Sequence, residues 1–393
     1  MKVIISLILI LIMMVSNFFG SFNTVPEDLG SAGNEVEIEL SVAEKALLTT
    51  VFETETAWLA SLQLENGAIP MTYAKNGVVA VNPYFADFAA LALLDNQEKY
   101  VDKVKAYMDW HFSHLNTADT DYNRVDGTIY DYSVTLENGK IVKEEITVKD
   151  GKKSYDSTDS YAATFRMVLN KYYEKTGDTD YIIENGDDIV RVAEAMFSTI
   201  NMGLTYAKPD YKVMYLMDNC EVYEGVKCAE KLLKIISEKD DAYALTCTKF
   251  SYASEWIKDT IENKLWNSEE KHYEAGIFAD GSAISDFTWD EFYPSATSQM
   301  FPIIHGVIPA DSIRAGALYN SFCEEYNWQE FDIPDSFCWG SNAYAAAVMG
   351  DTDSVITYME YYVAKCMLTH AYPLYNADAA KVAMAAYLLL NAE

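Results

Sequence analysis

The chain has 393 residues, 29 of them basic and 60 acidic, so its formal charge at pH 7 is −31. Half of the residues are hydrophobic and 23% are charged, which excludes a disordered tail, a collagen and a coiled coil. The acidic balance argues against nucleic acid and against a polybasic membrane patch, and it suits a neutral or cationic partner.

The first 20 residues have the pattern of an export signal, because Lys2 is followed by an unbroken apolar run from Val3 to Val15. The run is shorter than the about 20 apolar residues that a spanning helix needs. We therefore expect a secreted or cell-envelope protein whose only contact with a membrane is this segment, if it stays uncleaved as an anchor. Residues 21–42 are polar and acidic and are predicted to form a linker.

Apolar periodicity, caps and breakers then predict twelve helices. They are expected at 43–63, 82–95, 97–115, 156–175, 179–198, 218–238, 240–264, 294–305, 310–326, 341–349, 353–368 and 376–391. The even-numbered members are apolar on most sides, which is typical of buried helices, whereas the odd-numbered members carry charge on one face. Alternating inner and outer helices predict an all-α (α/α)6 barrel, a toroid over residues 43–393.

One segment breaks the helical pattern. Residues 127–153 alternate between apolar and polar and contain the turn signals Asn138-Gly139 and Asp150-Gly151. This pattern predicts a β-hairpin excursion. Short strands are also expected within 203–217 and 272–288.

The loops that enter the inner helices are the long, aromatic, carboxylate-rich parts of the chain, and in such a barrel they meet at one mouth. The loops that leave the inner helices are short, as at Asp95-Asn96 and Gly177-Asp178. Elaborate loops on a rigid scaffold are where function usually resides. We therefore expect the site at the elaborated mouth.

Several segments resemble the six-hairpin glycosidase superfamily in style. They are SLQLENGAIP (61–70), NPYFADFAALALLD (82–95), DGTIYDY (126–132), YDSTDSYAATF (155–165) and WGSNAYAAAVMGD (339–351). Proteins of this shape include glycoside hydrolases, mostly inverting, and some polysaccharide lyases. The resemblance implies a carbohydrate substrate bound in a groove at the mouth.

Carboxylates are the candidate catalytic side chains, because glycoside hydrolysis needs one protonated acid and one ionised partner. We predict Asp159 and Glu221 as acid candidates, and Asp126 or Asp156 as the base. Asp218 and Asp290 are further carboxylates of the mouth. The alternative for Asp156–Asp159 and for Asp218–Glu221 is a capping box, since an acid follows a cap residue three positions later. Turn formation is the alternative for Asp126-Gly127.

Aromatic residues on the mouth loops are expected to form the walls of the sugar-binding subsites. The predicted substrate-binding residues are Tyr84, Tyr130, Asp218, Trp289, Asp290, Tyr293, Trp339 and Asn342. Packing within the loops is the alternative for each aromatic residue.

The sequence predicts no metal site and no cofactor. The five histidines are scattered, the six cysteines lack zinc spacing, and nucleotide-binding and serine-hydrolase motifs are missing. The cysteines are expected to be free thiols packed as small hydrophobic residues. We thus predict a monomeric, exported glycoside hydrolase. The alternatives are a non-catalytic glycan-binding or cell-envelope protein and a polysaccharide lyase on the same scaffold.

Overall fold

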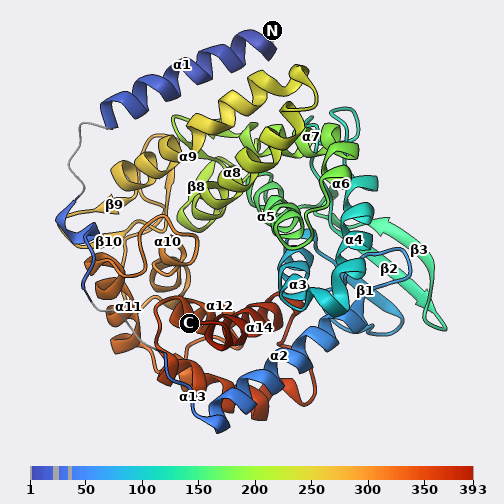
Figure 1. Cartoon of the computed structure of the whole chain (residues 1–393), viewed down its shortest axis with the longest axis vertical. Coiled ribbons are helices and arrows are strands. Elements are labelled where there is room, and N and C mark those ends of the chain that lie inside the picture. The colour runs from blue at the N-terminus through green and yellow to red at the C-terminus, as the bar shows by residue number, and fades with distance from the viewer. Residues whose placement is uncertain (1, 21–25, 34–37, 393) are drawn as a thin grey trace.

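A computed structural model describes residues 2–20, 26–33 and 38–392 of the chain. From residue 42 onward the helices form a ring with an inner and an outer layer (Figure 1). The inner helices are α3 (Pro83–Asp95), α5 (Asp159–Thr176), α8 (Leu216–Ser237), α10 (Phe301–Ile304), α12 (Gly340–Val348) and α14 (Asn376–Leu390). The outer layer consists of α2 (Val42–Leu62), α4 (Gln97–Ser113), α6 (Thr179–Glu184), α7 (Gly186–Phe197), α9 (Ala244–Lys264), α11 (Ile313–Glu325) and α13 (Thr352–Tyr362). This arrangement confirms the (α/α)6 barrel.

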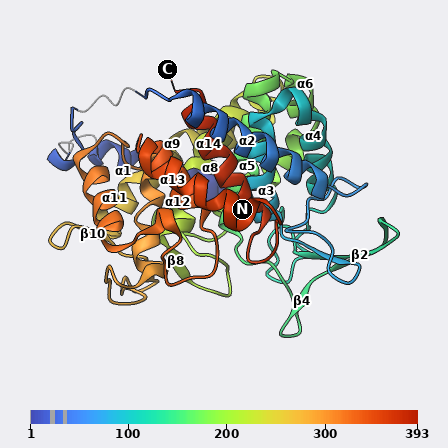
Figure 2. The same cartoon turned by 90° about the horizontal axis from the view of Figure 1, so that it is seen from below.

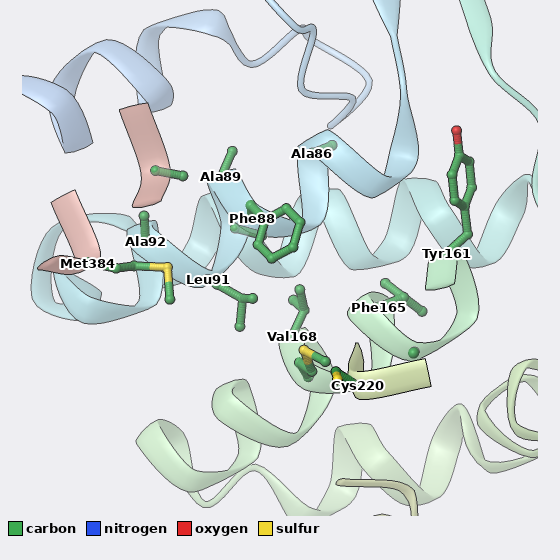
Figure 3. Close-up of a cluster of buried hydrophobic side chains, with 14 of the residues drawn as sticks. Ala86, Phe88, Ala89, Leu91, Ala92, Tyr161, Phe165, Val168, Cys220 and Met384 are labelled. Atoms are coloured by element: carbon green, nitrogen blue, oxygen red, sulfur yellow. The ribbon is translucent and has the colours of Figure 1, made fainter. Parts of the chain in front are cut away.

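The inner helices pack closely because their facing residues are small. At the contact between α5 and α8, a Cβ added to Gly225 would lie 2.7 Å from the Cα of Ala163. Side chains such as Phe88, Leu91 and Val168 fill the space between neighbouring inner helices (Figure 3). The C-terminal helix α14 packs between α12 and α3 and also against α2, so the last helix of the chain closes the ring.

Two predicted helices are interrupted. The predicted outer helix 179–198 divides into α6 and α7 at Asn185, whose backbone N–H and side-chain amide both donate to the carbonyl of Tyr181. The predicted inner helix 294–305 is a π-helical turn, Phe292–Ala296, followed by the short α10. Pro294 and Pro302 lack the backbone N–H that a continuous helix needs, and this explains the interruption. A second π-helical turn, Val363–Met367, extends α13 toward the predicted end at 368.

The predicted excursion at 127–153 consists of two hairpins. β2 (Tyr132–Glu137) and β3 (Lys140–Ile146) join β1 (Val78–Val81) in a three-stranded antiparallel sheet, and β4 (Val148–Lys149) pairs with β5 (Lys152–Lys153). Both predicted turns have the positive φ angles of a tight hairpin, 53° and 77° at Asn138-Gly139 and 52° and 77° at Asp150-Gly151. These hairpins project from one end of the ring (Figure 2).

The other expected strands are present as short antiparallel pairs. β6 (Ile200–Asn201) pairs with β7 (Leu204–Thr205), β8 (Val213–Tyr215) with β11 (Gly276–Phe278), and β9 (Trp266–Asn267) with β10 (His272–Tyr273). β8 lies on the same end of the ring as β2 and β4 (Figure 2). The long loops therefore gather at one mouth, as the sequence predicts.

The N-terminal segment contacts the ring in two places. Helix α1 (Lys2–Gly20) lies along α9, where Ile10 and Met13 are buried (Figure 1). The 3-10 turn η1 (Glu27–Leu29) docks on α11, because the guanidinium of Arg314 donates to both carboxylate oxygens of Asp28 at 2.9 and 3.0 Å. This part of the predicted linker is thus attached to the barrel. Within the described part of the chain, none of the helices has the length and apolar content needed to cross a membrane.

Candidate active site

The first turns of three neighbouring inner helices bring acidic side chains together at the mouth. Asp159 is the first residue of α5, Asp218 and Glu221 are the third and sixth residues of α8, and Asp87 lies on α3. Asp87, Asp159 and Glu221 are buried, whereas Asp218 is half-buried. The structure therefore places three of the predicted residues in one cluster and adds Asp87, which the sequence analysis did not select.

Asp159 is held by hydrogen bonds on both carboxylate oxygens. The hydroxyl of Thr205 donates to Oδ2 at 2.6 Å, and the backbone N–H of Ser160 donates to Oδ1 at 2.9 Å. Burial raises the pKa of Asp159 to about 7 in spite of these hydrogen bonds. The side chain has no exposed surface, so it lies behind the mouth.

Asp218 is the most accessible member of the cluster. Burial raises its pKa well above the ordinary value, and the negative charges of Asp159, Glu221 and Asp156 raise it further. Burial and the neighbouring carboxylates both favour the protonated form of Asp218, because like charges oppose its ionisation.

Glu221 is only 1% exposed and accepts a hydrogen bond of 2.5 Å from the hydroxyl of Tyr84. Burial raises the pKa of Glu221. The charge of His305, the hydrogen bond from Tyr84 and the charge of Lys381 act in the opposite direction and favour the ionised form. The cluster thus combines Asp218, whose surroundings favour the protonated form, with a partly charge-compensated Glu221 one turn deeper in the same helix.

A buried cation lies below this cluster. Lys381 is the sixth residue of α14, and its ammonium lies 4.0 Å from the ring centre of Phe88 and 5.1 Å from that of Tyr344. Burial lowers the pKa of Lys381 to about 8, although the charges of Glu221 and Glu224 favour its protonated form. Helices α14 and α8 lie on opposite sides of the ring (Figure 1), and Glu221 and Glu224 of α8 act on Lys381 through their charges.

Asp378 precedes Lys381 by one turn and lies at the mouth. It is half-buried and accepts a hydrogen bond of 3.3 Å from the backbone N–H of Gly340. Burial raises the pKa of Asp378 to about 6. The sequence analysis missed this residue, although Asp378 is the third residue of α14 as Asp218 is the third residue of α8. This shared position near the start of an inner helix was the sequence signal that could have identified Asp378.

The predicted base candidates lie in different surroundings. Asp156 is exposed and acts on Asp218 through its charge. Asp126 is instead paired with Arg191 of the outer helix α7, at 2.9 Å. The structure therefore brings Asp156 to the cluster and leaves Asp126 outside it.

The predicted capping boxes are wrong. The residue that caps α5 is Thr158 and the one that caps α8 is Tyr215, and neither makes a side-chain capping hydrogen bond. Both helices start at other positions than the pattern suggested, because Asp159 begins α5 and Asp218 lies inside α8. These carboxylates therefore do not serve as side-chain caps of α5 or α8.

Aromatic side chains line part of the rim. Tyr293 is 55% exposed, and its ring centre lies 5.6 Å from that of Trp339. The indole N–H of Trp339 donates to Asp335 at 2.9 Å, which fixes the ring at the start of α12. Burial raises the pKa of the Tyr293 hydroxyl, and the carboxyl groups of Asp218 and Asp156 raise it further, so this ring lies near the acidic cluster. Tyr293 and Trp339 thus connect the α8 side of the mouth with the α12 side.

The remaining predicted binding residues differ in accessibility. Trp289 is half-buried with its ring centre 5.3 Å from that of Phe287, and Asp290 is exposed. Asn342 is only 4% exposed. Tyr130 has no exposed surface, because it packs between Tyr122 and Tyr155. The prediction of Tyr130 as a subsite wall is therefore wrong, since a fully covered ring cannot stack on a sugar.

No group of three or more metal-ligating side chains suited to a metal ion occurs among the described residues. The mouth does hold several carboxyl groups whose pKa values are raised to different extents. Such pairs are the usual basis of acid–base catalysis.

Comparison with solved structures defines the class of fold: the chain has the architecture of (α/α)6 glycosidases. A glycosidase variant superimposes with a TM-score of 0.59 and 13% identity, over 90% of this chain and 98% of the other. A mannosylglycerate hydrolase of family GH63 from Thermus thermophilus, solved with glucose, superimposes with a TM-score of 0.56 and 10% identity, over 86% of this chain and 99% of the other. An α-amylase from Clostridium perfringens superimposes with a TM-score of 0.55 and 11% identity, over 86% of this chain and 97% of the other.

These likenesses confirm the fold that the sequence resemblance implied. No family model matches the chain, and no curated protein sequence matches it.

Proposed function

We propose that this protein is an exported glycoside hydrolase that cleaves a neutral or cationic oligosaccharide or polysaccharide. The observation that carries the proposal is the pair of half-buried carboxyl groups, Asp218 and Asp378, in the first turns of opposing inner helices. The fold shared with glycosidases supports it. The charge of −31 and the carboxylates of the mouth disfavour an anionic substrate.

In this proposal Asp218 is the general acid. Its raised pKa favours the protonated carboxyl group, which can donate a proton to the leaving oxygen. The fully buried Asp159 and Glu221, which the sequence analysis named as acid candidates, act on Asp218 through their charge and position it.

Asp378 is the general base. A pKa of about 6 leaves it ionised at neutral pH and basic enough to activate water. If the two carboxyl groups lie about 6.5–9.5 Å apart when substrate is bound, a water molecule fits between them and the reaction inverts the anomeric configuration. Asp156 is the alternative base, because it is exposed next to Asp218.

The proposal is tested with the full chain on a panel of neutral polysaccharides and amino-sugar polysaccharides, with mannosylglycerate as an anionic comparison that should not be cleaved. New reducing ends indicate hydrolysis, ultraviolet absorbance of unsaturated products indicates a lyase, and binding without turnover indicates the non-catalytic alternative. NMR of the first product reports the anomeric configuration.

We expect Asp218→Asn and Asp378→Asn each to lower kcat by about 10²–10⁴-fold, the usual contribution of a general acid or base. The matched control is Asp126→Asn, which removes a carboxylate outside the cluster and should leave kcat within a few-fold of the wild type. Full activity of Asp378→Asn together with loss in Asp156→Asn would transfer the role of base to Asp156.

A further inference from the structure

Two of the six cysteines lie in direct contact at the mouth. The sulfur atoms of Cys338 and Cys366 are 3.0 Å apart, and both residues are buried. Cys338 immediately precedes Trp339 and the inner helix α12, whereas Cys366 lies in the π-helical turn after the outer helix α13. Among the described residues, no other two cysteine sulfurs are in contact with each other.

We propose that Cys338 and Cys366 form a disulfide bond that joins the start of α12 to the end of α13. The inference rests on the proposed function only through export, because disulfides form in oxidising compartments. A thiolate of the pair attacks a small-molecule or enzyme disulfide, such as glutathione disulfide, and the mixed disulfide is resolved by the second cysteine. The pair loses two protons and two electrons, and the oxidant is reduced to two thiols.

The two thiols differ in acidity. Contact with the Cys366 thiol, burial and the negative charges of Asp378 and Glu55 raise the pKa of Cys338, whereas the hydrogen bond from the Cys338 thiol lowers the pKa of Cys366. Cys366 is therefore the thiol that ionises more readily and attacks the oxidant, and Cys338 resolves the mixed disulfide.

The bond would also order one wall of the candidate site. Trp339 has φ of 48°, in the left-handed region that side chains rarely adopt, and it is the direct neighbour of Cys338. The next residue, Gly340, donates its N–H to Asp378. The carbonyl of Cys338 is held by the hydroxyl of Tyr358 at 2.7 Å. A covalent link at Cys338 therefore restrains both the aromatic rim and the hydrogen-bond partner of the proposed base.

The experiment treats the exported full chain with iodoacetamide in denaturant, before and after reduction, and maps the peptides by mass spectrometry. We expect Cys338 and Cys366 to be protected until reduction and to appear as one linked peptide about 2 Da lighter than the two thiol peptides together. The other four cysteines should be alkylated at once. Alkylation of all six without reduction, or a different linked pair, would overturn the proposal.

Two variants distinguish loss of the disulfide from the general effect of replacing a cysteine. Cys338→Ser should leave Cys366 open to alkylation and lower Tm by about 5 °C in the oxidised protein, since the cross-link constrains the unfolded chain. The control Cys247→Ser lies on the outer helix α9 and should keep both the linked peptide and Tm. If Cys338→Ser does not fold, the peptide map of the wild type still decides. None of these readouts needs a substrate, so the result is independent of whether the chain is a glycosidase.

Discussion

Replacing Glu221 by Gln tests the electrostatic arrangement of the cluster. The change removes one negative charge three residues from Asp218 on the same helix, a spacing of about 5–6 Å between Cβ atoms. At an effective dielectric constant of about 20 this charge acts on Asp218 with about 3 kcal/mol, or about 2 pKa units. We therefore expect the alkaline limb of the kcat profile to move about 2 pH units downward, because Asp218 must be protonated to act as the acid.

The assay is hydrolysis of the best substrate from the panel, measured across the pH range with wild type and variant. The matched control is Glu224→Gln, which makes the same chemical change one turn deeper in α8 and should move the limb clearly less, because Glu224 is farther from Asp218 and is paired with His305 at 2.7 Å. An alkaline limb that does not move in Glu221→Gln would refute the reasoning. Loss of activity at every pH would instead make Glu221 itself the catalytic acid.

Three further predictions concern stability. Folding raises the pKa of Asp159 from 3.8 to about 7. The free energy of unfolding should therefore fall by up to about 4 kcal/mol as the pH rises between these two values. Asp159→Asn should flatten this decline, measured by denaturant unfolding. Folding lowers the pKa of Lys381 from 10.5 to about 8, so stability should increase between pH 8 and 10.5, and Lys381→Met should remove this increase in a thermal melt. Gly225→Ala should lower the free energy of unfolding by about 1–3 kcal/mol in denaturant unfolding, because the added Cβ would meet Ala163. The control Gly316→Ala on α11 should not destabilise, because the added Cβ has open space there. Equal stability of the two variants would contradict the close packing of α5 and α8.

The fold was predictable because the relevant signals are local. The apolar periodicity of α5 and α14 and the turn signals at Asn138-Gly139 act within a few residues, so they specify helices and hairpins without tertiary information. The interruption at Asn185 was missed, since a turn at an Asn-Gly pair competes with a helical pattern that continues on both sides.

The site was predictable only in part. Asp218 and Glu221 were found because they cluster within one segment of sequence. The proposed pairing of Asp218 with Asp378, and the effect of Glu221 on Lys381, depend on which helices face each other across the ring. Residues so far apart in the chain carry no mutual signal in a single sequence. The same limit explains why Asp126 was selected, although it pairs with Arg191.

The position of α14 has a consequence for synthesis of the protein. This helix closes the ring between α12 and α3, and it also supplies Asp378 and Lys381. A nascent chain in which α14 has not yet been made has neither the proposed base nor the buried cation. The two ends of the barrel must meet, α14 against α2, before the mouth is complete. Activity should thus appear only after α14 has been synthesised and has docked on α2.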